Sequence, residues 1–205
     1  MSDVEAAAEQ IANGATAAVL DVSDIAAVKA FFESRPAFHI LVNNAGTNRP
    51  KPMWDVTEED YDAIYDLNVK SAFFVAQACA HKMIAEGAHG SLIHMSSQMG
   101  HVGGPNRSLY CGSKWALEGM NKAFALDLAT HGIRSNTIAP TFIETPMTKP
   151  FFEDPAFEMQ VLSKIKLGRI GQVEDLMGAI LFLASDASAL MTGTSMIIDG
   201  GWTAD

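Results

Sequence analysis

Tyr110 and Lys114 are four residues apart, the spacing that places two side chains on one face of a helix. The pair has chemical interest because a tyrosine, with a reference pKa of about 10, is a poor base at neutral pH unless a nearby cation stabilises its phenolate. Lowering that pKa by about three units requires about 4 kcal/mol of additional stabilisation of the phenolate, part of which must come from a group other than the lysine. A Tyr-x-x-x-Lys pair alone is more often a surface pair, so the surrounding elements decide its meaning.

Polar or turn-forming residues stand directly after three apolar segments. Ser96 and Ser97 follow one segment, the run Asn43-Asn44-Ala45-Gly46 follows a second, and Pro140 ends a third. If the segments are parallel strands, their carboxyl ends meet at one crevice, where doubly wound sheets bind their ligands. We expect Ser97 to act there and interpret Ser96 as a turn residue, because Ser97 has the better offset from Tyr110.

Short apolar runs rich in β-branched residues alternate with longer helical patterns, which predicts repeated βαβ units on a parallel sheet. We predict strands at residues 16–20, 39–42, 91–95, 133–138 and 195–198. Ser23 is placed to cap a helix that Pro36 stops, Thr57 and Asp60 form a capping-box start, and Gly132 is placed to end another helix. The predicted helices cover about residues 23–36, 57–84, 110–130 and 173–184.

Residues 144–166 lack a clear period and contain three prolines. We expect the segment at about 141–166 to be a functional lid, because connectors this long are seldom simple. Its phenylalanines either line a pocket under the lid or pack the lid down; they are Phe142, Phe151, Phe152 and Phe157.

The composition fits one globular domain over residues 1–205, with 48% hydrophobic residues and a formal net charge of −10. The acidic balance, without any basic cluster, argues against nucleic acid or an anionic membrane as a partner. The sequence has neither a signal peptide pattern nor an apolar run long enough to cross a bilayer. Cys79 and Cys111 cannot form a disulfide framework, which suits a reducing cytoplasm.

Taken together, these motifs resemble the short-chain dehydrogenase/reductase family. The order and spacing of Asn43-Asn44-Ala45-Gly46, Asn68, Ser97, Tyr110-x-x-x-Lys114 and Asp199-Gly200-Gly201 carry the similarity. The resemblance implies a doubly wound, Rossmann-like α/β fold and hydride transfer with NAD or NADP.

The resemblance also implies roles for individual residues. Tyr110 resembles the general acid/base, Lys114 the residue that holds the nicotinamide ribose and lowers the tyrosine pKa, and Ser97 the group that polarises the carbonyl. Asn68 resembles the residue that kinks its helix and holds a water on a proton path to Lys114. By the same resemblance, the cofactor contacts are Tyr110, Lys114, Asp21 at the adenine, and Asn43, Ala45, Gly46, Pro140, Ile143 and Thr145.

One departure from the family pattern is large. The family opens with a strand, a glycine-rich turn, a helix and a second strand, and this sequence begins after them. We therefore expect an N-terminally truncated member whose sheet lacks its first two strands and the Gly-rich turn that binds pyrophosphate. Met1 then reads as an internal methionine, and residues 2–13 as the helix leading into the strand at 16–20. The residue that selects NAD or NADP would lie in the missing part.

Other residues invite plainer interpretations. We expect His94 to be a satisfied strand residue, Cys111 a buried structural thiol, and the turn at Asp199 structural. His101 either borders the pocket or lies on an exposed loop. The histidines have no metal-ligand spacing, so no metal is expected. Apolar residues on the helices at 57–84 and 110–130 indicate a homo-oligomer, a dimer or a homotetramer as in the family.

The leading functional hypothesis is an NAD(P)-dependent oxidoreductase that interconverts a secondary alcohol and a ketone on a small molecule, such as a sugar, sugar acid or polyol. A 3-oxoacyl thioester reductase is an alternative within the same chemistry. A non-catalytic remnant that acts only by subunit association is an alternative of another class.

Overall fold

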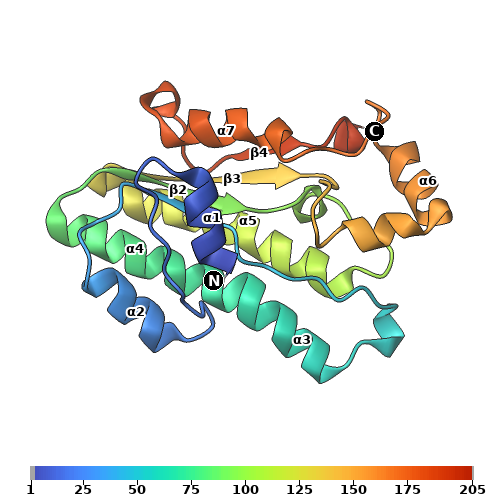
Figure 1. Ribbon diagram of the computed structural model, residues 1–205, viewed down its shortest axis with the longest axis horizontal. Coiled ribbons are helices and arrows are strands. Elements are labelled where there is room, and N and C mark those ends of the chain that lie inside the picture. Colours follow the sequence, from blue (N-terminus) through green and yellow to red (C-terminus); the bar gives the residue numbers. More distant parts are fainter. Residues whose placement is uncertain (1–2, 205) are drawn as a thin grey trace.

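The computed structural model describes residues 3–204, which contain one parallel sheet (Figure 1). Its strands lie side by side in chain order: β1 (Ile40–Asn43), β2 (Gly90–Met95), β3 (Ile133–Pro140) and β4 (Ser195–Ile198). Neighbouring strands are parallel throughout, with Gly90 opposite Ile133 and Met95 opposite Ile138 in the central pair. Four of the five predicted strands and the parallel α/β architecture are thus confirmed.

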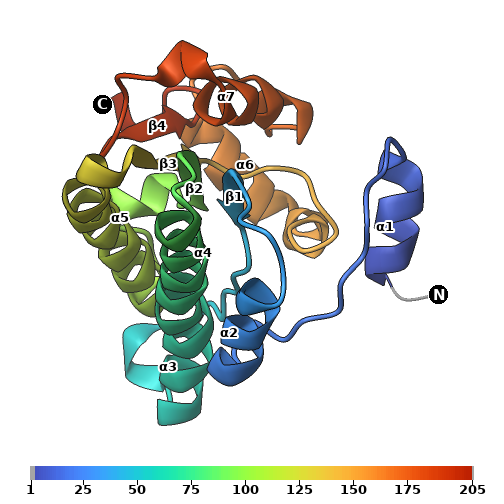
Figure 2. The same cartoon turned by 90° about the vertical axis from the view of Figure 1, so that its left-hand side faces the viewer.

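Helices cover both faces of this sheet, as a doubly wound fold requires (Figure 2). On one face lie α4 (Ala72–Glu86) and α5 (Ser108–Leu128), and α2 (Ile25–Glu33) packs against α4. On the other face lies α7 (Glu174–Ala184). The alternation of strand side chains feeds both cores, since Leu92 packs on the α4 side and Ile93 on the α7 side.

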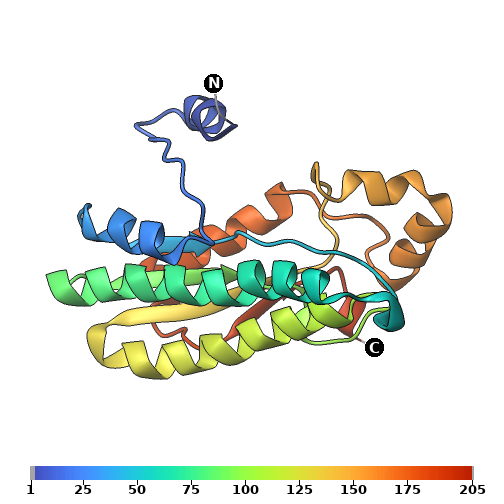
Figure 3. The same ribbon diagram turned by 90° about the horizontal axis from the view of Figure 1, so that it is seen from below.

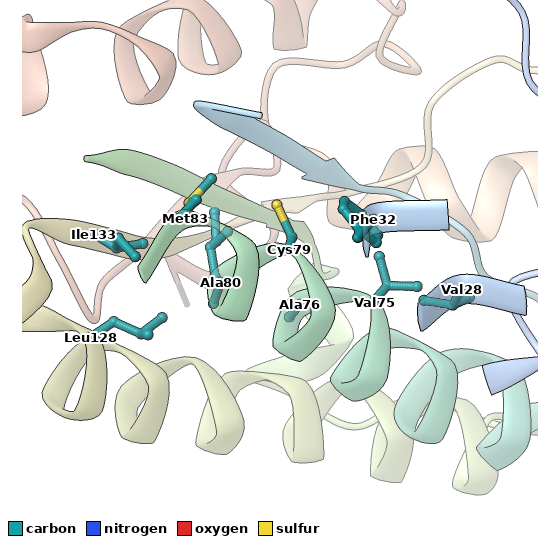
Figure 4. Packing of buried hydrophobic residues seen from close by; sticks show 10 residues of the cluster. Val28, Phe32, Val75, Ala76, Cys79, Ala80, Met83, Leu128 and Ile133 are labelled. Carbon is teal, nitrogen blue, oxygen red and sulfur yellow. The ribbon is translucent and has the colours of Figure 1, made fainter. Parts of the chain in front are cut away.

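The larger core lies between α2, α4 and the sheet (Figure 4). Phe32 of α2 is buried beside α4 residues, and Met83 at the far end of α4 is completely buried. Other members of the cluster are Val28, Val75, Ala76, Cys79, Ala80, Leu92, Leu128 and Ile133. Because a continuous apolar cluster holds α4 against the sheet, the residues that lead into its other end, Asn68 among them, are held in place as well.

The long helix predicted at 57–84 is interrupted by one wider turn. Thr57 and Asp60 form the predicted capping box, with Thr57 N donating to Asp60 Oδ2 at 3.1 Å, and α3 (Glu58–Tyr65) begins there. A π-helical turn, η2 (Asp66–Ser71), then joins α3 to α4 and contains Asn68. Such turns are frequent at functional sites.

Two predictions near the N-terminus are wrong. Residues 16–20 form no strand, and Val19 is 82% exposed, because no described strand pairs with this segment. The cap of α2 is Asp24 rather than Ser23, since Asp24 Oδ1 accepts the Ala27 N–H at 3.0 Å. The helix predicted over 2–13 is present as α1 (Asp3–Ile11), which stands away from the sheet (Figure 3); Met1 and Ser2 lie outside the described residues.

The predicted lid contains more regular structure than we expected. It holds a 3-10 turn, η5 (Lys149–Glu153), and a helix, α6 (Pro155–Lys164), which Asp154 caps by accepting from Ala156 N at 2.9 Å. Further 3-10 turns are η1 (Met53–Asp55), η3 (Gln98–Gly100), η4 (Ala129–His131), η6 (Asp186–Ser188) and η7 (Trp202–Ala204). Among the described helices, none has the length and apolar character to span a membrane.

Candidate active site

A cleft of about 880 Å³ opens at the carboxyl ends of β1, β2 and β3. The residues that follow each of these strands line it: Asn44 and Gly46 after β1, Ser96 and Ser97 after β2, and Thr141 after β3. Its other walls come from the start of α5, residues 142–151 and α7. The convergence of three strand ends on one cleft is the arrangement expected from the sequence.

Tyr110 and Lys114 lie one turn apart on α5, and both line the cleft. The Lys114 Nζ lies 5.6 Å from the centroid of the Tyr110 ring and donates to the carbonyl oxygen of Met95 at 2.7 Å. Burial lowers the pKa of Lys114 to about 8, although the charge of Glu118 opposes this shift. The ammonium is therefore held in the cleft with its ionisation close to neutral pH.

The Tyr110 pKa shifts in the direction opposite to the one expected from Lys114. Burial raises the pKa of Tyr110, and this effect outweighs the lowering by its hydrogen bond with Ser97 and by the charge of Arg107. The phenol consequently stays protonated at neutral pH. It is ready to donate a proton, and its use as a base requires additional positive charge in the cleft.

Ser97 lines the cleft, and its hydroxyl acts both as a hydrogen-bond donor and as an acceptor. Its Oγ accepts the Met99 N–H at 3.1 Å and donates to Gln98 Oε1 at 2.7 Å. The hydroxyl is also hydrogen-bonded to Tyr110, so the two groups lie next to the same part of the cleft. Gln98 holds the Ser97 side chain, a contact that the sequence did not reveal.

Asn68 ties the loop after β1 to α5. Its Oδ1 accepts the Thr47 N–H at 2.8 Å, and its Nδ2 donates to the Thr47 carbonyl at 2.9 Å and to Ser113 Oγ at 3.1 Å. A Cβ on Gly46 would lie 3.3 Å from Asn68 Oδ1 and 3.8 Å from Lys114 Nζ. The absence of a side chain at Gly46 therefore keeps the space beside Lys114 open.

The other residues predicted to bind a cofactor fall into two groups. Pro140, Ile143 and Thr145 line the cleft. Asn43 does not, because its Nδ2 donates to the Ala72 carbonyl at 2.8 Å and so holds β1 against α4. Ala45 also lies outside the lining, although its neighbours Asn44 and Gly46 belong to it.

Asp21 lies away from the cleft. Its Oδ1 accepts from Ser23 N at 2.9 Å and from Ser23 Oγ at 2.7 Å, and these bonds lower the pKa of its carboxyl group. The structure therefore does not bring Asp21 together with Tyr110 and Lys114, and its proposed contact with an adenine stays a prediction.

Within the described part of the chain, three buried polar atoms at the cleft have no hydrogen-bond partner: Asn48 Oδ1, Ser96 Oγ and Thr141 Oγ1. Buried polar atoms without partners are costly, so their gathering here fits a ligand rich in hydroxyl and amide groups. Together with Lys114, they suit the ribose and nicotinamide end of a dinucleotide. Among residues 3–204 the cleft lining contains no glycine-rich strand-to-helix turn, so a pyrophosphate site is not located.

The remaining candidates resolve as follows. His94 is a buried strand residue, as predicted; burial lowers its pKa to about 4, and its Nε2 lies 3.2 Å from Ser135 Oγ. Cys111 is buried, and burial raises its pKa. His101 is partly buried and lies 3.0 Å from Ser195 Oγ, outside the cleft lining.

The aromatic residues of the lid divide between the two roles left open. Phe142 and Phe151 line the cleft. Phe152 and Phe157 pack behind Phe142, with ring centroids 6.0 and 5.7 Å from its own. Sequence reasoning missed several other residues of the cleft, namely Asn48, Gln98, Met99, Arg107, Met147, Thr148, Val173, Leu176, Met177 and Ile180.

Comparisons with known proteins agree with this geometry. The enoyl-(acyl carrier protein) reductase family model matches residues 1–203. L-xylulose reductase from Bos taurus is 36% identical over 191 residues, which are 93% of this chain and 78% of that protein. The crystal structure of a gluconate 5-dehydrogenase from Burkholderia cenocepacia J2315, in complex with NADP and tartrate, has a TM-score of 0.91 and 36% identity, covering 98% of this chain and 81% of the other.

A second solved structure carries the family's own name. A short-chain type dehydrogenase/reductase from Mycobacterium marinum has a TM-score of 0.91 and 34% identity, covering 98% of this chain and 82% of the other. The family model, the curated relative and the superposed structures together show that the chain belongs to the short-chain dehydrogenase/reductase family of oxidoreductases, which use NAD or NADP.

Proposed function

We propose that this protein uses NAD or NADP to interconvert a secondary alcohol and a ketone on a sugar, sugar acid or polyol. The observation that carries the proposal is the convergence of Ser97, Tyr110 and Lys114 on one cleft. The names of the relatives support the substrate class, since they include L-xylulose reductase and gluconate 5-dehydrogenase.

The protein's own residues supply the proton chemistry. The nicotinamide, when bound, donates or accepts the hydride. In reduction, Ser97 turns its hydroxyl from Gln98 toward the substrate oxygen, and Tyr110 donates its phenolic proton to the same oxygen. The Lys114 Nζ lies 5.6 Å from the centroid of the ring that then carries the phenolate. In oxidation the same groups act in reverse, with Tyr110 accepting the proton.

Burial sets when each group can act. The raised pKa of Tyr110 keeps the phenol protonated for reduction. The oxidative direction needs the phenolate, so it would gain from additional positive charge in the cleft, such as that of an oxidised nicotinamide. We therefore expect oxidation to require a higher pH than reduction.

The proposal extends to assembly and location. Trp115 and Leu126 on α5 are 55% and 79% exposed, which supports a homo-oligomer that covers this helix. Cys79 and Cys111 are both free thiols, which supports a reducing, cytoplasmic setting.

The substitution Tyr110→Phe tests the proposed function. Removing the acid/base is expected to lower kcat by about 10²- to 10⁴-fold. Turnover is measured by the change in nicotinamide absorbance, with sugars, sugar acids, polyols and a 3-oxoacyl thioester as substrates. Tyr61→Phe is the matched control, because Tyr61 stacks on Tyr65 outside the cleft. Equal turnover by the wild type and Tyr110→Phe, or no saturable cofactor binding, would overturn the proposal and favour a non-catalytic chain.

A further inference from the structure

Arg107 is a buried cation in the cleft that the proposed reaction does not use. It directly precedes α5, is only 7% exposed, and lines the same cleft as Tyr110, three residues further on. Its guanidinium carbon lies 6.0 Å from the centroid of the Phe151 ring, on the lid side of the cleft. The charged end of Arg107 therefore lies near the lid, and its charge also acts on Tyr110, whose pKa it lowers.

Among residues 3–204, the guanidinium of Arg107 has almost no hydrogen-bond partner. Its one hydrogen bond among the described residues runs from Nη1 to the carbonyl oxygen of its neighbour Asn106, at 3.4 Å. Each of the other arginines makes at least two hydrogen bonds, and two of them, Arg49 and Arg169, bond with carboxylates. Arg169, for instance, makes two bonds with Asp175, at 2.6 and 2.8 Å. A buried guanidinium without a carboxylate is costly, so this arrangement indicates a group that arrives from outside.

The charge of the cleft points to the sign of that group. The chain has 24 acidic residues against 14 lysines and arginines. Yet the described lining residues include two cations, Arg107 and Lys114, and neither an aspartate nor a glutamate. Lys114 already donates to the Met95 carbonyl, whereas most N–H groups of Arg107 are unused. Although the protein is acidic, the described lining of the cleft thus contains no carboxylate near the Arg107 guanidinium.

We infer that Arg107 binds a carboxylate of the substrate, which makes the substrate a hydroxy acid or oxo acid rather than a neutral polyol. The planar guanidinium matches a carboxylate with two parallel hydrogen bonds and would fix the substrate's position relative to Tyr110 and Ser97. The apolar ring of Phe151 near the guanidinium strengthens such a pair by excluding water. This inference rests on the proposed function.

Pairs of substrates that differ only in charge test the inference. D-gluconate and L-tartrate, each with its neutral amide, are compared by kcat/KM in the wild type, Arg107→Gln and Arg107→Lys. Arg107→Gln is expected to lower kcat/KM for the acids by about 10- to 100-fold and to change the amides by less than about threefold. Arg107→Lys should recover part of the loss. Lys149→Gln is the matched control, since it removes one exposed cation outside the cleft lining.

Equilibrium binding separates this inference from the proposed function. Titration calorimetry of the same acids and amides needs no turnover, and the wild type should bind the acids more tightly, a preference that Arg107→Gln abolishes. Loss of turnover with this preference intact would contradict the proposed function alone. Turnover with equal use of acids and amides, or a loss in Arg107→Gln that is the same for both, would overturn the inference alone.

Two further outcomes also decide the matter. If Arg107→Gln changes only the preference for NADP over NAD, the guanidinium binds a cofactor phosphate and the inference is wrong. If Arg107→Gln fails to fold, as circular dichroism would reveal, Arg107→Lys carries the test, because a flexible ammonium should keep the preference for acids but weaken it.

Discussion

Replacing Asn68 by alanine should loosen the loop after β1 from α5. The change removes three hydrogen bonds, two to the backbone of Thr47 and one to Ser113. A buried hydrogen bond contributes about 0.5–1.5 kcal/mol, and water reaches part of Thr47. We therefore expect the free energy of unfolding to fall by about 2–3 kcal/mol. Because the same loop carries Gly46 beside Lys114, kcat/KM should fall by about tenfold or more.

Urea unfolding followed by tryptophan fluorescence measures the stability change. Gln77→Ala is the matched control, because Gln77 is exposed on α4 and should change stability by less than about 0.5 kcal/mol. Asn68→Asp can still accept from Thr47 N but cannot donate to Thr47 O or Ser113, so it should lose almost as much as alanine. A loss below about 0.5 kcal/mol with unchanged kcat/KM would refute the positioning role of Asn68.

Further predictions concern stability. Burial lowers the pKa of His94 to about 4, so folding releases its proton, and stability should decline as the pH falls from about 6.5 toward 4. Between about pH 7 and about pH 5 this amounts to about 2 kcal/mol, and His94→Asn should lack that part of the decline in urea titrations. Gly90→Ala would place a Cβ 2.6 Å from the His39 carbonyl oxygen and should destabilise the protein by about 1–3 kcal/mol. Gly119→Ala, which has open space on α5, should stabilise it by up to about 1 kcal/mol. Equal melting temperatures of the two variants would contradict both expectations.

The sequence predicted those parts of the fold that depend on local pattern. The apolar run at β2 and the capping box at Thr57 are both local signals, and both appear in the structure. The run at 16–20 has the same β-branched character, but a strand also needs a partner, and propensity carries no information about neighbours. The helix α6 was missed because the prolines of the lid suggested a loop, although Asp154 followed by Pro155 is a good helix start.

The site shows the same division. Spacing alone placed Tyr110 and Lys114 on one helical face. The direction of the Tyr110 pKa shift could not be read from spacing, because burial sets it and burial depends on the lid and the strand ends together. Arg107 was missed for the same reason. An arginine in a loop normally faces solvent, and only the packing of the cleft reveals that its charge is enclosed.

The exclusion of carboxylates from the cleft has a kinetic consequence for any anion that enters it. At a distance, the anion meets a molecule of net charge −10 and is repelled. Inside the cleft it meets Arg107 and Lys114 and is attracted. Dissolved salt screens the distant field first, since the Debye length is about 8 Å at physiological ionic strength. Anion association should therefore speed up as salt is raised from low concentration, the reverse of ordinary electrostatic steering.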